Sequence, residues 1–146
     1  MAIEPRWYTQ ISWSDPITLE RLRLSGESIS EQPGVYLFHV DKIKPSPGRV
    51  RYVGEAKNLK KRLRAYAIDY MIAKNYDNHR GRLFIFSAHR SYPYRLYVRW
   101  AVYGGHRNEL EASLIHYLQP WYNTRDEEAR HGVLADDERL DPRYLP

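Results

Sequence analysis

A dense group of basic side chains is the first feature of this 146-residue sequence that could take part in chemistry. Residues 42–64 contain nine Lys and Arg residues and one acid, Glu55. A surface with so little compensating negative charge attracts a phosphate backbone, with an affinity that depends on salt. A solvated helix face is the alternative explanation of such a run. We expect a phosphate-binding surface that includes Lys57, Lys60, Lys61 and Arg64.

Arg62 differs from its basic neighbours in its position. It lies three residues after Leu59 and four before Tyr66, so a helix would hold it at the edge of an apolar stripe. An arginine held there by packing can present its planar guanidinium to a charged transition state. The alternative is that its stem covers apolar surface while its head stays in water.

Glu111 is a carboxylate on or beside the apolar face of a predicted helix. Leu114, Ile115 and Leu118 follow it at helical spacing. A carboxylate in such a place costs free energy unless a cation compensates it. Mg²⁺ often uses one or two protein carboxylates together with water and phosphate oxygens. Position alone leaves open a metal ligand and a salt bridge to an arginine, the second being slightly favoured.

Several other classes of site and protein are excluded by the sequence. The chain has no Cys, so disulfides, thiolate zinc sites and cysteine nucleophiles are ruled out. The six His residues lack zinc-ligand spacing, and neither a glycine-rich phosphate loop nor a nucleophile elbow is present. No apolar run could span a membrane and the N-terminus does not resemble a secretory signal. We expect a cytoplasmic protein with no membrane partner, either monomer or homodimer.

Hydrophobic patterns predict the elements that must position these residues. Segments rich in β-formers predict strands at 34–40, 49–53 and 94–103, the first two forming a hairpin around a Pro/Gly turn. Apolar residues at helical spacing predict helices at 18–24, from Asn58 to near residue 74, and at about 107–118. Residues 76–93 fit a strand or a short helix. We predict an α+β domain with a three-stranded antiparallel sheet flanked by helices.

Composition divides the chain into three parts. Residues 1–123 carry a net charge of +8 and residues 124–146 a net charge of −3. We expect an N-terminal extension over 1–33, a domain over 34–123, and a charged tail over 124–146 that wraps the surface or stays mobile. A basic body with an acidic tail favours a polyanionic partner.

Four blocks in this order resemble the GIY-YIG nuclease family. Gly34-Val35-Tyr36 stands where that family has its first signature, and Tyr52-Val53-Gly54 stands where it has the second. The stretches GEAKNLKKRLRAY and LEASLIHYLQPWYN, residues 54–66 and 110–123, are similar to the N-terminal nuclease domain of the UvrC branch, a bacterial excision-repair endonuclease subunit. The resemblance covers residues 33–123 and implies the GIY-YIG fold.

The resemblance also implies a site and a reaction. It implies a metal-dependent endonuclease that hydrolyses DNA phosphodiester bonds, with Glu111 as the ligand of a single Mg²⁺ or Mn²⁺. Arg62 would stabilise the charged phosphoryl group. Tyr36 or Tyr52 would orient or deprotonate the attacking water, which for a base requires nearby cations to lower a tyrosine pKa. The implied catalytic set is Tyr36, Tyr52, Arg62, Tyr66, Glu111 and Asn123, the last as a supporting residue.

Two departures from the UvrC-like pattern keep alternatives open. Those sequences often have Lys where this chain has Glu55, and residues 74–95 look longer than the corresponding connection. An acid near a phosphate site is tolerable only if it faces away or meets a cation. A catalytically inactive DNA-binding module on the same scaffold is therefore the main alternative, and an adaptor that binds partners through its aromatic N-terminus is a third. Roles in repair, restriction, mobile elements and defence remain equally compatible.

Overall fold

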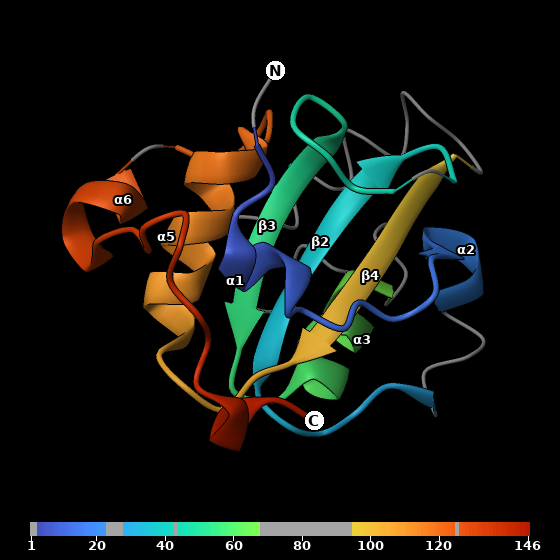
Figure 1. Ribbon diagram of the computed structural model, residues 1–146. Coiled ribbons are helices and arrows are strands. Elements are labelled where there is room, and N and C mark those ends of the chain that lie inside the picture. Colours follow the sequence, from blue (N-terminus) through green and yellow to red (C-terminus); the bar gives the residue numbers. More distant parts are fainter. Residues whose placement is uncertain (1–2, 23–27, 43, 68–94, 125) are drawn as a thin grey trace.

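The computed structural model describes residues 3–22, 28–42, 44–67, 95–124 and 126–146 and has a sheet with helices on both faces (Figure 1). The four strands are antiparallel to their neighbours and lie in the order β1-β4-β2-β3. Their bounds are Ile17–Thr18 (β1), Gly34–Val40 (β2), Val50–Ala56 (β3) and Leu96–Val102 (β4). The α-helices are Arg6–Thr9 (α1), Leu19–Leu22 (α2), Leu59–Ala67 (α3), Arg107–Leu118 (α5) and Asp126–His131 (α6), and the 3₁₀ helix η3 is Pro142–Tyr144.

Strand β2 is the centre of the molecule because helices cover both of its faces, and all seven of its residues are buried. Alternate side chains enter two separate cores, as the pleat of a strand requires. Tyr36 and Phe38 pack with Leu59 and Leu63 of α3 on one face. On the other face Val35 and Leu37 pack with the apolar residues of α5, which include Leu110, Leu114, Ile115 and Leu118.

Most of the predicted elements are confirmed. The strand at 34–40, its hairpin with the next strand, and the helix at 107–118 occur as expected, although β3 continues to Ala56. Asn58 caps α3, because its Oδ1 accepts a hydrogen bond from the backbone N–H of Lys61 at 3.0 Å. The predictions for residues 76–93, and for the helix beyond Ala67, lie outside the described residues.

The prediction of three strands was wrong, because the sheet has a fourth. Ile17 and Thr18 pair with Val98 and Tyr97 at the outer edge of β4. Two residues cannot show the alternation by which a strand is recognised, and α2 follows directly, so the sequence pattern favoured a helix alone here.

The two terminal segments pack together against α5 and the sheet. Trp7, Tyr8 and Leu140 are buried in the same core as Leu114. The backbone N–H of Arg6 donates to the carbonyl of Asp136 at 2.7 Å, and the N–H of Leu140 donates to Gln10 Oε1 at 2.6 Å. The described part of residues 124–146 is therefore folded onto the body of the molecule. No helix in the described ranges is long and apolar enough to cross a bilayer.

Candidate active site

The site is built around Tyr36, which points from β2 into the core beneath α3. Its hydroxyl forms a hydrogen bond with the hydroxyl of Tyr66, with 2.8 Å between the oxygens, and both residues are buried. The ring of Phe38 lies 5.0 Å from that of Tyr66 and fixes its orientation. Across the hairpin, Tyr36 faces Gly54, where a Cβ atom would overlap the Tyr36 ring. The glycine of the second signature therefore makes room for the tyrosine of the first.

The pKa of Tyr36 responds to four of the other predicted residues. Burial raises the pKa of Tyr36 most; Tyr52 and Glu111 raise this pKa further, whereas the hydrogen bond from Tyr66 and the charge of Arg62 lower it. Strands β2 and β3 with helices α3 and α5 thus carry five of the six predicted residues, four of which act on the pKa of Tyr36.

This environment bears on the expectation that nearby cations would lower the pKa of a tyrosine. For Tyr36 the expectation was wrong: removal from water dominates, and the pKa of its hydroxyl is raised well above the usual range. Burial likewise raises the pKa of Tyr66. Both hydroxyls are therefore protonated at neutral pH and suit hydrogen bonding better than proton abstraction. Tyr52 is only half-buried, so it is the more accessible of the two candidate tyrosines.

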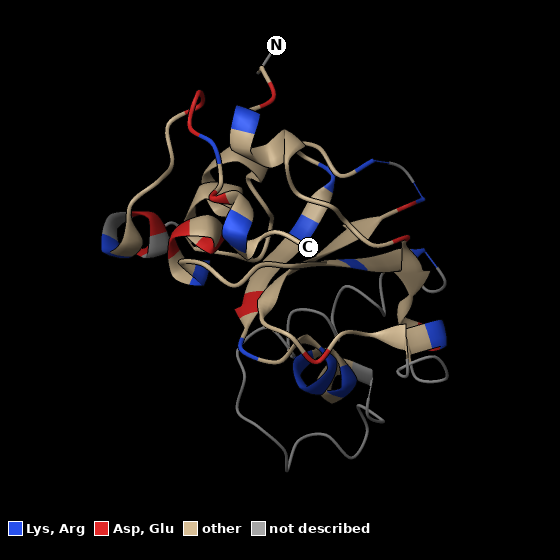
Figure 2. Ribbon diagram, turned by 60° about the horizontal axis from the view of Figure 1, so that its bottom comes forward, with Lys and Arg blue, Asp and Glu red and all other residues tan. Residues whose placement is uncertain are grey.

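Helix α3 carries the basic surface beside these tyrosines, and Figure 2 shows the Lys and Arg colour gathered on this helix. Leu59, Leu63 and Tyr66 are buried, and Arg62 lies half-buried next to them, at the edge of the apolar stripe. Lys57, Lys61 and Arg64 are exposed and Lys60 is half-exposed. Within the part of the chain that the structure describes, no acid forms an ion pair with any of these four residues.

Glu55, the acid that stands in the motif where UvrC-like sequences often have Lys, forms an ion pair with a cation. Its Oε2 accepts a hydrogen bond from Arg107 Nε at 2.9 Å. Their side chains are 28% and 22% exposed, so water screens the pair partly. The pair joins the end of β3 to the first residue of α5, and it neutralises the acid locally. No sequence signal distinguished Arg107 from the other arginines of the chain.

Glu111 lies half-buried on α5, one turn after the helix begins. The described residues contain no cluster of three or more His, Cys, Asp and Glu side chains that could enclose a metal. A zinc site with three or four protein ligands does not fit this donor set. A hard cation that keeps most of its waters does fit, because Mg²⁺ commonly accepts one or two carboxylates together with substrate oxygens.

Asn123 fixes the end of α5 to the outer edge of β3. Its Oδ1 accepts a hydrogen bond from the Val53 N–H at 2.8 Å, and its Nδ2 donates to the Val53 carbonyl at 2.9 Å. One residue earlier, the N–H of Tyr122 donates to the carbonyl of Arg51 at 2.9 Å. The side-chain amide thus bonds both backbone groups of Val53, as a neighbouring strand would. This arrangement positions Tyr52, the residue before Val53.

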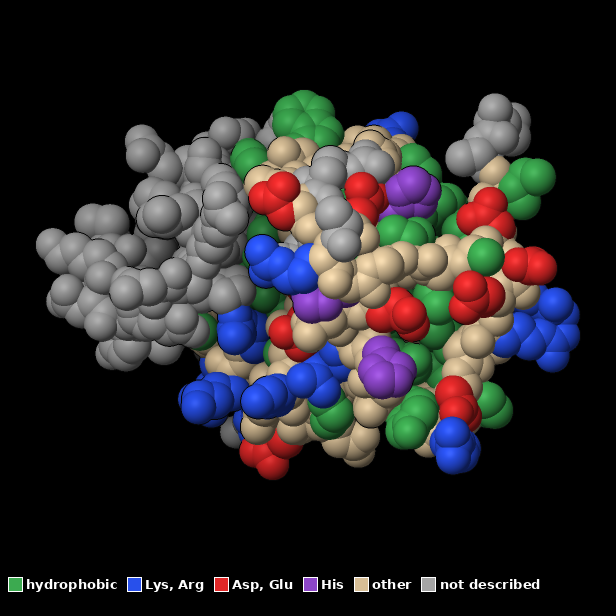
Figure 3. All heavy atoms as spheres, turned by 90° about the vertical axis from the view of Figure 1, so that its left-hand side faces the viewer, with side chains coloured by type: hydrophobic (Ala, Val, Ile, Leu, Met, Phe, Trp, Pro, Cys, Tyr) green, Lys and Arg blue, Asp and Glu red, His purple; other side chains and the backbone are tan. Residues whose placement is uncertain are grey.

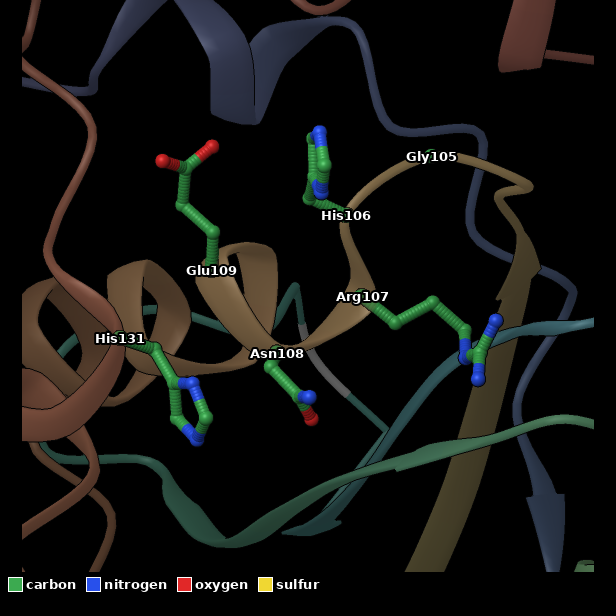
Figure 4. A pocket seen from close by; sticks show the side chains of 6 residues that line it. All are labelled: Gly105, His106, Arg107, Asn108, Glu109 and His131. Carbon is green, nitrogen blue, oxygen red and sulfur yellow. The ribbon is translucent and has the colours of Figure 1, made fainter.

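A separate hollow of about 430 Å³ lies at the start of α5, lined by residues 105–109 and His131. Figure 4 shows that its side chains do not converge: Arg107 extends toward the strands, and Glu109 and His131 point in different directions. None of the residues predicted to react lines this hollow.

Comparison with known proteins finds a curated relative. The UvrABC system protein C of Lawsonia intracellularis (strain PHE/MN1-00) is 34% identical over 116 residues, which are 77% of this chain. This likeness in sequence adds to the signatures that the structure places around Tyr36. The chain is UvrC-like in sequence and carries the GIY-YIG signatures. It spans 14% of the length of that curated relative. No family model matches the chain.

Two solved structures are also similar to the UvrC-like chain. Both are point mutants of the GIY-YIG N-terminal endonuclease domain of UvrC from Thermotoga maritima, bound to a catalytic divalent cation. They are 27% and 28% identical, with TM-scores of 0.47 and 0.46, and each match covers 73% of this chain and 98% of the other.

The UvrC-like signatures contain two glycines whose purpose sequence reasoning missed. Gly54 accommodates the ring of Tyr36, and at Gly34 a Cβ atom would overlap the carbonyl of Ala101 on β4 and meet Leu59 on α3. Both glycines permit close approach between strands and helix. The signal was present in the motifs, but only the strand register reveals which atoms approach.

Proposed function

We propose that this protein is a metal-dependent endonuclease that hydrolyses phosphodiester bonds in DNA. The observation that carries the proposal is that Arg62 and Glu111 both act on the buried Tyr36, which is hydrogen-bonded to Tyr66, next to the basic side chains of α3. Tyrosine hydroxyls, one guanidinium and one carboxylate suit phosphoryl transfer, in which most of the catalysis is positioning and charge stabilisation. The sequence likeness to the UvrABC system protein C supports this choice.

The chain's own residues divide the work by chemistry. Glu111 would hold Mg²⁺ or Mn²⁺, and a bound divalent cation would supply charge neutralisation for the phosphate and the leaving oxygen. Arg62, held at the edge of the core, would donate to a phosphate oxygen. Tyr52 would orient the attacking water. Tyr36 and Tyr66 are both protonated, so one hydroxyl would donate to the other and the second would donate into the site. Asn123 would support Tyr52 without reacting.

The basic surface would bind the DNA backbone on either side of the reacting phosphate. Lys57, Lys60, Lys61 and Arg64 lie on or just before α3, beside Arg62. In the face that Figure 3 shows, Lys and Arg side chains gather next to the grey residues. Most Asp and Glu side chains lie farther from the grey residues. Contacts of this kind carry no base specificity, and their strength falls with salt.

The test is cleavage of supercoiled plasmid and of single-stranded DNA with Mg²⁺, with Mn²⁺ and with EDTA. We expect metal-dependent cutting by the wild type and losses of about a hundredfold or more in Glu111→Gln and Arg62→Ala. Glu109→Gln is the matched control, because it makes the same change two residues away on α5. Nicked as opposed to linear product distinguishes single-strand from double-strand cleavage.

Two results would contradict the proposal. Equal activity in Glu111→Gln and Glu109→Gln would remove Glu111 from the site. Salt-dependent DNA binding by a wild type that cuts none of these substrates with either metal would favour the inactive DNA-binding module instead. The ion pair of Glu55 with Arg107 supports the nuclease over that alternative, because Glu55 meets a cation.

A further inference from the structure

Trp121 is a large aromatic side chain that the proposed site does not use. It is 62% exposed, in contrast to Trp7, which is 1% exposed. It follows α5 and lies at the outer edge of β3, two residues before Asn123. A single exposed apolar residue is ordinary on a protein surface, so its surroundings must decide whether it has a role.

The surroundings of Trp121 hold its ring in a fixed place. The Arg51 guanidinium carbon lies 4.0 Å from the centre of the ring, and Arg51 itself is only 8% exposed. The backbone N–H of Trp121 donates to the carbonyl of Val50 at 3.4 Å, and the backbone N–H of Tyr122 donates to the carbonyl of Arg51 at 2.9 Å. The ring therefore stands on a buried cation, with its backbone attached to β3, while most of its surface remains open.

An aromatic ring with a guanidinium behind it is suited to stacking a nucleic-acid base. Such stacking strengthens binding and tolerates any base sequence, because every base has a π-face. The guanidinium is attracted to the ring and adds positive charge near the phosphates. A base inside a regular duplex already stacks on its neighbours, so only an unpaired base can use the ring.

The ring of Trp121 and the guanidinium of Arg51 lie at the edge of β3, the strand that also carries Tyr52. Arg51, which supports the ring, directly precedes Tyr52 in β3, and because neighbouring side chains of a strand point to opposite faces, the ring and Tyr52 flank one edge of the strand. Trp121 is bonded at Val50 and Asn123 at Val53, so one edge of β3 carries both the ring and the residue that positions Tyr52. A bound strand that runs from the reacting phosphate along this edge would meet the ring.

We propose that Trp121, supported by Arg51, stacks an unpaired base of the strand that holds the reacting phosphate, so that the substrate is single-stranded or locally unpaired DNA. This inference rests on the proposed function for the reacting phosphate alone, since base stacking can be measured without cleavage. The ligand of the Trp121 ring is an unstacked nucleobase, and the neighbouring phosphates lie near the Arg51 guanidinium.

The test is the affinity for three labelled oligonucleotides of one sequence, measured by fluorescence anisotropy in EDTA at fixed salt. They are a single strand, a fully paired duplex, and a duplex with a central unpaired bubble. We expect Trp121→Ala to weaken binding of the single strand and the bubble by about fivefold to a hundredfold, and of the duplex by less than about twofold. Trp121→Phe keeps a ring and should retain most of the affinity, whereas Trp121→Leu should resemble Trp121→Ala.

The matched control is Tyr144→Ala, since Tyr144 is 40% exposed and has the Arg143 guanidinium 5.5 Å from its ring. It should bind all three oligonucleotides as the wild type does. Circular dichroism and the melting temperature check that each variant is folded.

Several results would overturn the inference. Trp121→Ala could lose as much affinity for the duplex as for the single strand, or Trp121→Leu could bind as tightly as the wild type. Tyr144→Ala could lose as much affinity as Trp121→Ala, or the wild type could bind no DNA. A Trp121→Ala variant that loses only self-association in sedimentation would make the ring an interface between copies. A wild type that binds unpaired bases through Trp121 but never cuts would support the stacking and contradict the nuclease.

Discussion

At Gly54 the missing side chain provides the space that the ring of Tyr36 occupies. Gly54→Ala would force the ring or the hairpin to move, and overpacking of this kind costs about 1–3 kcal/mol of unfolding free energy. Activity should fall as well, because the displaced ring carries the hydroxyl that meets Tyr66. Urea unfolding measures the loss of stability. At Gly104 an added Cβ would make only an ordinary contact, so an unaffected Gly104→Ala is the expected control.

The hydroxyl pair of Tyr36 and Tyr66 is open to a double-mutant cycle. We expect Tyr36→Phe and Tyr66→Phe each to lower the unfolding free energy, and the double variant to lower it by less than the sum. The difference should be about 0.5–1.5 kcal/mol, the usual net contribution of one buried hydrogen bond. Strictly additive losses in urea unfolding would mean that the two hydroxyls stabilise the fold independently.

The site residues were predictable from the sequence because their motifs have fixed spacing, but their protonation states were not. The density of cations around Tyr36 suggested a lowered pKa, whereas burial, which only the packing of α3 on β2 reveals, raises it. The partner of Glu55 was equally beyond sequence reasoning, because Arg107 lies 52 residues away along the chain.

At the scale of elements, Asn123 joins α5 to β3 and can be tested as a positioning residue. Asn123→Ala leaves both backbone groups of Val53 without the amide, which should lower the unfolding free energy by about 1–3 kcal/mol. Asn123→Asp can still accept from the Val53 N–H but cannot donate to its carbonyl, so it should recover only part of this loss. We expect cleavage by Asn123→Ala to be reduced but still metal-dependent, as measured on single-stranded DNA.

Strands β2 and β4 share a buried histidine that makes stability depend on pH. Burial and then the charge of Arg99, whose Nε donates to His39 Nε2 at 3.1 Å, lower the pKa of His39 from 6.5 to about 4. Below pH 6.5 the unfolded chain binds a proton that the folded chain refuses until about pH 4. The contribution of His39 is therefore complete above pH 6.5 and is lost as the pH falls toward 4.

The loss amounts to about 3 kcal/mol at most, since one unit of pKa corresponds to about 1.4 kcal/mol. Urea unfolding at pH 7.5 and pH 4.5 measures it. His39→Gln keeps an acceptor for Arg99 but does not titrate, so its stability should change less between these two pH values. An equal change in both proteins would assign the pH dependence to carboxylates instead.

The elements themselves were predicted where their patterns were long. The twelve residues of α5 carry apolar residues at helical spacing and the seven of β2 are rich in β-formers, whereas the two residues of β1 are too few to show either signal. Strand β1 exists because β4 presents an open edge beside it, which is a tertiary cause that no local pattern records.

At the scale of the whole molecule, the two ends of the chain complete the core that the sheet and α5 begin. Leu140 is 3% exposed and packs in the same cluster as Trp7 and Leu114. Leu140→Ala should therefore lower the unfolding free energy by about 2–5 kcal/mol. Val133→Ala removes an apolar side chain from a residue that is 36% exposed, and it should have little effect in the same urea titration. A small loss at Leu140 would mean that the C-terminal segment detaches without unfolding the rest.

The edge of β3 has a further consequence for the protein in concentrated solution. The chain's own residues 121–123 already take up hydrogen-bonding groups of Val50, Arg51 and Val53 along that edge. At the opposite side of the described sheet, β1 is two residues long and runs directly into α2. Neither edge offers a long row of free amides on which a foreign strand could grow. Strand-by-strand aggregation into cross-β fibrils is thereby opposed by the native topology itself.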